Sequence, residues 1–214
     1  MKLTLYYAPS TCALVPYVTL TEAGADFEVR KLNFRAAQHM TPDYLAINPL
    51  HKVPVLEIDG GERLTENVAI QLWISRAYPA ARLLPTDPLQ EVKAISIMAW
   101  CASGIHPHLT RINSPSKFCD APGSEASIRA LAVKPLLENF AAADKRLAGR
   151  DFFFDHFTAA DAHFFWTYRR ASQFDLQLGV FANCNAHFAR MLSRASVQKV
   201  LAFEKETLDG FSKS

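Results

Sequence analysis

The chain has 214 residues, of which 50% are hydrophobic and 21% charged, a composition that is typical of a folded protein and excludes a disordered chain. Lys and Arg total 23 against 21 Asp and Glu, so the net charge of +2 gives no electrostatic reason to expect nucleic acid binding. The chain starts without a signal-like apolar stretch, and its longest charge-free run, residues 94–110, is shorter than the ~20 residues of a membrane span. We therefore expect a cytoplasmic protein with no membrane or nucleic acid partner, and a core helix over 94–110.

Residues 1–80 alternate strand and helix patterns. Pro16 fits a helix only in its first turn, so the first helix is predicted to start near Cys12 or Ala13, and Gly24 is predicted to end it. These assignments predict an α/β domain of order βαβαββα. Its predicted elements are a strand over 3–7, the helix ending near 24, a strand over 27–31, a helical turn over 44–47, strands over 53–58 and 62–64, and a helix over 65–78.

Three prolines within residues 78–88 predict a connector, and the strand patterns end there. We expect residues 1–80 to form the first domain, 81–88 a linker and 89–214 an all-helical domain. The predicted helix caps of the second domain are Asp87 with Pro88 at the first position, Ser124 for a helix running to Gly149, and Thr158 with Asp161 three residues later.

The four cysteines lack both the paired spacing of a zinc site and the density of a disulfide scaffold. They are Cys12, Cys101, Cys119 and Cys184. We expect no metal and reduced thiols. Cys12 lies at a predicted helix N-terminus, which favours a low-pKa thiolate, although a small buried side chain is an equally good interpretation.

Two further segments are candidates for binding. A proline at the start of the Val53-Pro54 strand favours pairing with an extended peptide, while an edge strand or a bend is the simpler alternative. Glu66-Asn67 begins a predicted helix, where a carboxylate and free N–H groups are suited to an amino acid zwitterion. Ordinary helix capping is the alternative there.

The order and spacing of these segments resemble the cytosolic glutathione S-transferases over essentially the whole chain. The matching motifs are Ser10-Thr11-Cys12, residues 48–56 (NPLHKVPVL), residues 64–70 (LTENVAI) and residues 157–161 (FTAAD). The resemblance implies a thioredoxin-like first domain, an all-helical second domain and glutathione as co-substrate. It also implies that residues 157–161 form a helix cap that serves folding.

Within this family, the proline matching Pro54 is cis, and the backbone of Val53 is expected to pair with the cysteinyl unit of glutathione. The resemblance places the γ-glutamyl end at Glu66 and Asn67. Cys12 resembles the cysteine of the bacterial beta class. His106 resembles the histidine that reaches the same pocket in that class, and a core or interface histidine is the alternative.

The sequence also departs from the family pattern. His51 replaces a usual glycine, and Asn67 a usual serine. Ala36 stands near a beta-class lysine that contacts the glycine end of glutathione, a contact for which we name Lys52, Arg35 or Gln38 as substitutes. The activator of the thiol is left open, because Ser10, Tyr6 and Tyr7 match the positions of activating residues in other classes.

The resemblance implies a homodimeric detoxification enzyme that conjugates the glutathione thiolate to a hydrophobic electrophile, with Cys12, Ser10 and His106 as candidate catalytic residues. One alternative is a glutathione-dependent thiol–disulfide reductase acting through Cys12. The other is a non-catalytic binding scaffold of the same fold. The sequence does not identify the electrophile.

Overall fold

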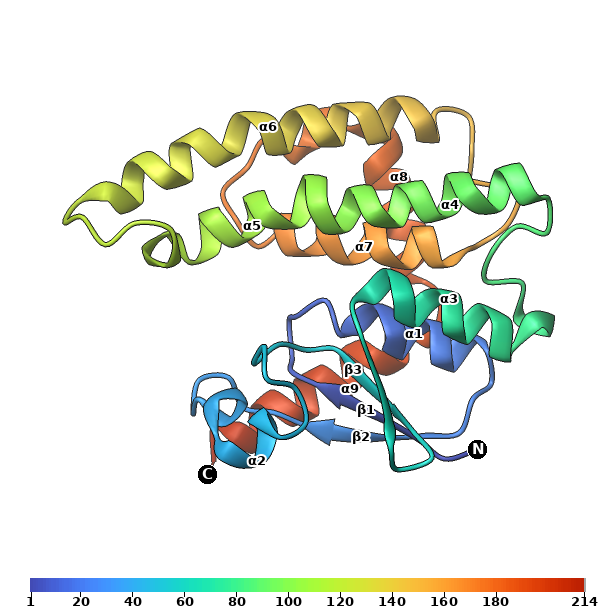
Figure 1. The fold of residues 1–214 in the computed structure, drawn as a ribbon. Coiled ribbons are helices and arrows are strands. Elements are labelled where there is room, and N and C mark those ends of the chain that lie inside the picture. The colour runs from blue at the N-terminus through green and yellow to red at the C-terminus, as the bar shows by residue number, and fades with distance from the viewer. Residues whose placement is uncertain (214) are drawn as a thin grey trace. The chain divides into compact units, whose positions relative to one another are not determined.

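The computed structural model describes residues 1–213, which form two compact units (Figure 1). The first unit combines Met1–Leu83 with the C-terminal segment from Ser193, and the second is Leu84–Leu192. This division differs from the predicted second domain over 89–214. The reason is that helix α9 (Ala195–Phe211) packs against helix α1 (Leu14–Glu22) of the first unit.

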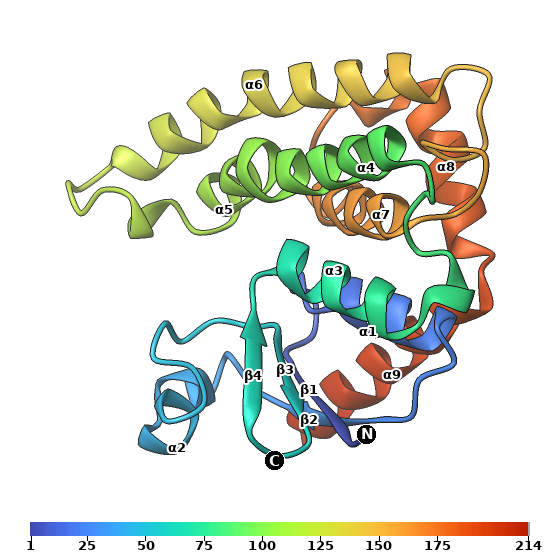
Figure 2. The ribbon, with the colours of Figure 1, turned by 45° about the vertical axis from the view of Figure 1, so that its right-hand side comes forward.

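The first unit is built on a mixed four-stranded sheet in the described chain, with the strand order β2-β1-β3-β4. Strand β1 pairs parallel with β2 and antiparallel with β3, which pairs antiparallel with β4. Figure 2 shows α1 and α3 side by side along the sheet. The predicted thioredoxin-like βαβαββα order is confirmed. The elements are β1 (Leu3–Tyr7), α1, β2 (Phe27–Lys31), η1 (Gln38–Met40), α2 (Pro42–Leu45), β3 (Val55–Ile58), β4 (Glu62–Thr65), α3 (Asn67–Ala77) and η2 (Pro79–Ala81).

Burial and turn chemistry explain the first β-α unit. Leu3, Leu5 and Tyr7 of β1 are buried, as expected for a strand in the middle of the sheet. Helix α1 starts at Leu14, close to the predicted start, and ends at Glu22. Gly24 then adopts a φ of +63°, a left-handed conformation that glycine adopts readily. The predicted stop is therefore confirmed.

The second unit is helical. The Asp87 side chain accepts a hydrogen bond from the Gln90 N–H at 2.9 Å, and Thr158 and Asp161 form a capping box, so both predicted caps are confirmed. The prediction for Ser124 is wrong: Gly123, at a φ of +79°, is the cap, and Ser124 is already helical. The elements are α4 (Pro88–Trp100), η3 (Cys101–Ile105), α5 (His106–Asn113), η4 (Pro115–Lys117), α6 (Ser124–Leu147), α7 (Ala159–Ala171), η5 (Leu178–Val180) and α8 (Ala182–Leu192).

The predicted core helix over 94–110 is interrupted by a π-helical segment, η3. Trp100 donates its indole N–H to Asn139 Oδ1, and Asn139 Nδ2 donates to the Gly104 carbonyl at 3.3 Å. A Cβ at Gly104 would lie 2.6 Å from Trp100 Cδ1, so the packed indole requires glycine there. The segment ends at Ile105, directly before His106, a predicted site residue and the first residue of α5. No helix in residues 1–213 is long and apolar enough to cross a membrane.

Candidate functional site

Three predicted site residues meet in the first unit. Cys12 lies in the turn before α1, and its Sγ–H donates to the Val53 carbonyl at 3.5 Å. From α3, Asn67 Nδ2 donates to the Cys12 carbonyl at 3.1 Å. The thiol, the strand that follows Val53 and the start of α3 are thus joined by direct hydrogen bonds, although the sequence separates them by 41 and 55 residues.

The Val53-Pro54 peptide bond is cis, as the family resemblance implied. Both residues are buried, and the regular strand β3 begins only at Val55, two residues later than predicted. Pro54 therefore removes no donor from the sheet ladder. The backbone of Val53 lies outside the ladder, next to the Cys12 thiol.

Glu66 and Asn67 form the start of α3. Glu66 has a φ of +64°, and its exposed side chain makes no capping hydrogen bond to the helix. Asn67 is buried, and its Oδ1 atom has no hydrogen-bond partner in the described chain. Helix capping therefore does not explain the acidic side chain at this position.

Helix α9 supplies a fourth residue near these groups, Glu204. Glu204, 2% exposed, accepts the hydroxyl hydrogen bond of Tyr7 and the backbone N–H of Ser10, the latter at 2.8 Å. Ser10 has a φ of +63°, a costly conformation for a residue with a side chain, and the bond to Glu204 holds it there. Sequence reasoning missed Glu204, because it lies 194 residues from Ser10 and no local motif marks it.

The expectation of a low-pKa thiol at Cys12 is wrong for the free protein. Burial raises the pKa of Cys12 to about 12, and the Glu66 carboxylate adds to this effect. The backbone N–H of Cys12 itself, the Asn67 amide and the Lys52 ammonium lower the pKa but do not outweigh burial. Because α1 starts only at Leu14, Cys12 also lies outside the first helical turn. The thiol is protonated at neutral pH and acts as a hydrogen-bond donor.

The remaining candidates of the first unit lie around the Val53 loop and on the neighbouring surface. His51, at the position where the family usually has glycine, has a φ of +53°, so the loop keeps a left-handed turn with a larger side chain. Lys52 is exposed, and its backbone carbonyl is held by two buried side chains. Arg35 and Gln38 are exposed, and the Gln38 side chain accepts the Asn33 N–H at 2.8 Å.

His106 belongs to the second unit, where it is the first residue of α5. Its ring packs edge-on against Trp166 at a centroid distance of 4.6 Å. Burial, aided by His106, lowers the pKa of the nearby His163 to about 3, so His163 is neutral. The role of His106 at the thiol stays a prediction.

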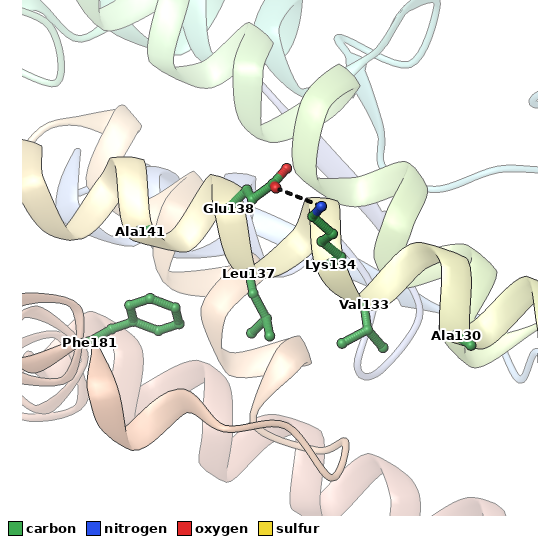
Figure 3. A pocket seen from close by; sticks show the side chains of 7 residues that line it. All are labelled: Ala130, Val133, Lys134, Leu137, Glu138, Ala141 and Phe181. Carbon is green, nitrogen blue, oxygen red and sulfur yellow. Dashed lines mark ion pairs between the residues drawn. The ribbon is translucent and has the colours of Figure 1, made fainter.

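A hollow of 490 Å³ lies on the second unit along α6, with Val133, Leu137 and Phe181 pointing toward it (Figure 3). None of the predicted site residues lines it. The polar groups in its lining, Lys134 and Glu138, pair with each other at 4.0 Å. Within residues 1–213, no cluster of three or more His, Cys, Asp or Glu side chains is arranged to hold a metal ion.

The sequence of this chain is similar to those of known proteins. Residues 1–76 match the family model of the glutathione S-transferase N-terminal domain. The chain is 32% identical over 205 residues to glutathione S-transferase GstA of Escherichia coli O157:H7, covering 94% of this chain and 98% of that protein.

Solved structures agree as well. A glutathione transferase homologue from Sulfitobacter with bound glutathione superposes with a TM-score of 0.88 at 25% identity, over 94% of this chain and 97% of that one. A beta-class glutathione S-transferase of Sphingomonas chungbukensis superposes with a TM-score of 0.83 at 30% identity, over 94% and 98%. The chain therefore belongs to the glutathione S-transferase family and has its fold, a thioredoxin-like N-terminal part and a helical region.

Proposed function

We propose that this protein is a glutathione transferase that binds the tripeptide at the first unit and conjugates its sulfur to a hydrophobic electrophile. The observation that carries the proposal is the convergence of Cys12, Val53 and Asn67, joined by hydrogen bonds at 3.5 and 3.1 Å. The Sulfitobacter relative contains glutathione on the same fold, which supports the choice of ligand. In this arrangement the cysteinyl unit lies along the Val53 backbone, and the γ-glutamyl end lies at Glu66 and Asn67.

The chemical step is nucleophilic attack by the thiolate of bound glutathione. The glutathione thiol loses its proton to solvent, its sulfur forms a C–S bond with the electrophile, and the leaving group departs with the bonding electrons, or the electrons stay on the adduct where the reaction is an addition. A hydrogen bond donated to the sulfur favours the thiolate and lowers its pKa. Cys12 is suited to this task because its raised pKa keeps the S–H group protonated.

Binding of the tripeptide requires Cys12 to exchange one acceptor for another. In the free protein its thiol donates to the Val53 carbonyl. When the cysteinyl N–H of glutathione takes over that carbonyl, the Cys12 S–H is released to donate to the bound sulfur. Ser10 remains the alternative donor. His106 is proposed to act on the same sulfur.

The protonated thiol argues against thiol–disulfide exchange at Cys12 as the main activity, because exchange requires a thiolate. The non-catalytic scaffold is also less well supported, since Glu66 and Asn67 hold unused polar atoms at the proposed ligand site. We also propose that the protein detoxifies electrophiles in the cytoplasm as a homodimer. Lys52 is proposed to contact the glycine end of glutathione.

Glu66→Ala tests the ligand assignment directly. Removing the carboxylate deletes the ion pair with the γ-glutamyl ammonium, so glutathione affinity should fall on the order of tenfold, as for a charge-assisted contact. Isothermal titration calorimetry measures the change. Glu62→Ala, which removes an exposed carboxylate from β4, is the matched control and should bind like the wild type. Equal affinities for both variants would remove Glu66 from the site.

A further inference from the structure

The loop before the cis peptide is anchored through one atom, the backbone carbonyl oxygen of Lys52. Tyr44, from α2, donates its hydroxyl to this oxygen at 2.6 Å. Asn48 donates its side-chain Nδ2 to the same oxygen at 2.8 Å. Both side chains are nearly inaccessible, at 4% and 3% exposure. Two buried donors on one carbonyl fix the plane of the peptide that joins Lys52 to Val53.

The orientation of that plane decides where the Val53 N–H points. The Lys52-Val53 peptide is trans, and in a trans peptide the C=O and N–H bonds point in opposite directions. Because the carbonyl is directed at Tyr44 and Asn48, the N–H is directed away from both. Within residues 1–213 the Val53 N–H donates to no other group, whereas the Val53 carbonyl accepts from Cys12. One free donor is thus presented at the site.

Both anchoring side chains are themselves fixed. Burial raises the pKa of Tyr44, which keeps its hydroxyl protonated and able to donate. Its ring packs against Tyr6 of β1 at a centroid distance of 5.9 Å. Asn48 Oδ1 accepts the Leu50 N–H at 3.1 Å, so its amide orientation is set, and Nδ2 must face Lys52. These contacts make the anchor rigid before any ligand arrives.

We propose that Tyr44 and Asn48 are positioning residues that aim the Val53 N–H at the cysteinyl carbonyl oxygen of glutathione. The proposal rests on the proposed function and extends it, because neither side chain touches the ligand. A hydrogen bond is directional, and a rotated peptide would leave the N–H unable to reach the acceptor. The contribution of Tyr44 and Asn48 to binding affinity should therefore appear only for ligands that carry the cysteinyl carbonyl.

Tyr44→Phe separates positioning from folding when two ligands are compared. Glutathione carries the cysteinyl carbonyl, whereas γ-glutamylcysteamine keeps the γ-glutamyl end and the thiol but lacks the carbonyl and the glycine. The variant should bind glutathione about tenfold more weakly, the loss of roughly one hydrogen bond, and should bind γ-glutamylcysteamine like the wild type. In turnover assays, KM for glutathione should rise while kcat changes little.

Tyr17→Phe is the matched control, since it removes a tyrosine hydroxyl from α1, and Tyr17 neither contacts the Lys52 carbonyl nor belongs to the proposed site. It should bind both ligands like the wild type. Asn48→Ser, which shortens the second donor, should repeat the selective loss and serves if Tyr44→Phe does not fold.

The possible failures are distinguishable. Equal weakening of both ligands, or no weakening of either, in a folded variant would overturn the positioning role while leaving the proposed function intact. A wild-type protein that binds neither ligand would overturn the proposed function and this inference with it.

Discussion

Three non-glycine residues near the site, Ser10, His51 and Glu66, have φ values of +63°, +53° and +64°. Left-handed or similar backbone costs on the order of 1–2 kcal/mol for a residue with a side chain, so each conformation must be held by its surroundings. Ser10 is held by the buried Glu204 carboxylate, and His51 precedes the carbonyl that Tyr44 and Asn48 anchor. Three of the strained positions therefore lie on loops that belong to the proposed tripeptide site, and Ala37, Asp59 and Arg82 have positive φ values elsewhere in the described chain.

Cysteine chemistry gives a test at the level of single residues. Burial raises the pKa of Cys12 to about 12, whereas the Ala121 N–H and the Ser124 hydroxyl lower the pKa of Cys119. Alkylation requires the thiolate, so at neutral pH iodoacetamide should modify Cys119 faster than Cys12, on the order of a hundredfold or more. Peptide mass spectrometry over a time course measures both rates. Cys119→Ser should abolish the fast adduct, and a Cys12 adduct that forms first would contradict the assigned protonation state.

Prediction from sequence succeeded for features of the fold that depend on residues close together in the sequence. Three helix ends are set by residues adjacent in the sequence, so the sequence alone predicts where they lie. They are the start of α4 at Asp87-Pro88, the start of α7 at the Thr158–Asp161 capping box, and the end of α1 before Gly24. The pKa of Cys12 was mispredicted because burial is a property of the folded surroundings. Tyr44 and Glu204 were missed for the same reason, since the contacts that define their roles exist only after folding.

At the scale of elements, the C-terminal helix joins the first unit through a cluster at its N-terminus. Arg194 donates two hydrogen bonds to the Glu22 carboxylate, at 3.0 and 2.7 Å, and the Ser196 hydroxyl donates a third. Burial alone would raise the pKa of Glu22, but these donors outweigh it and the pKa is lowered. The cluster attaches α9 to the end of α1 and so helps to place Glu204 beneath Ser10.

Glu22→Gln should therefore lower the free energy of unfolding by about 1–2 kcal/mol at neutral pH, the value of a partly exposed charge-assisted cluster. A lowered carboxyl pKa stabilises the fold above the unfolded value, and this contribution is lost as the pH falls through the folded pKa. The difference in the free energy of unfolding between Glu22→Gln and the wild type should thus shrink below pH ~4. Urea unfolding at several pH values measures this difference. Glu28→Gln, an exposed residue with longer ion pairs, is the control; a difference that stays constant with pH would contradict the assignment.

At the scale of the whole molecule, the chain combines a thioredoxin-like unit that is completed by its own C-terminal helix with a helical unit over Leu84–Leu192. The similarity to GstA extends over 94% of the chain and thus includes both units. All residues that we propose for tripeptide binding lie in the first unit. The Cys12 thiol is protonated at neutral pH and donates a hydrogen bond, so in the reaction we propose the reactive sulfur is that of glutathione.

The most direct test is the ultraviolet difference spectrum of the thiolate when the protein is saturated with glutathione at neutral pH. The free protein should show no Cys12 thiolate, and saturation should produce a thiolate band that S-methylglutathione does not produce. If Cys12 donates the hydrogen bond to the bound sulfur, Cys12→Ala should weaken the thiolate band. If Ser10 is the donor instead, Ser10→Ala should weaken the band more than Cys12→Ala does. Calorimetry shows whether glutathione binds. Binding with no thiolate band above that of the free tripeptide would contradict the claim that the protein activates the thiol of bound glutathione.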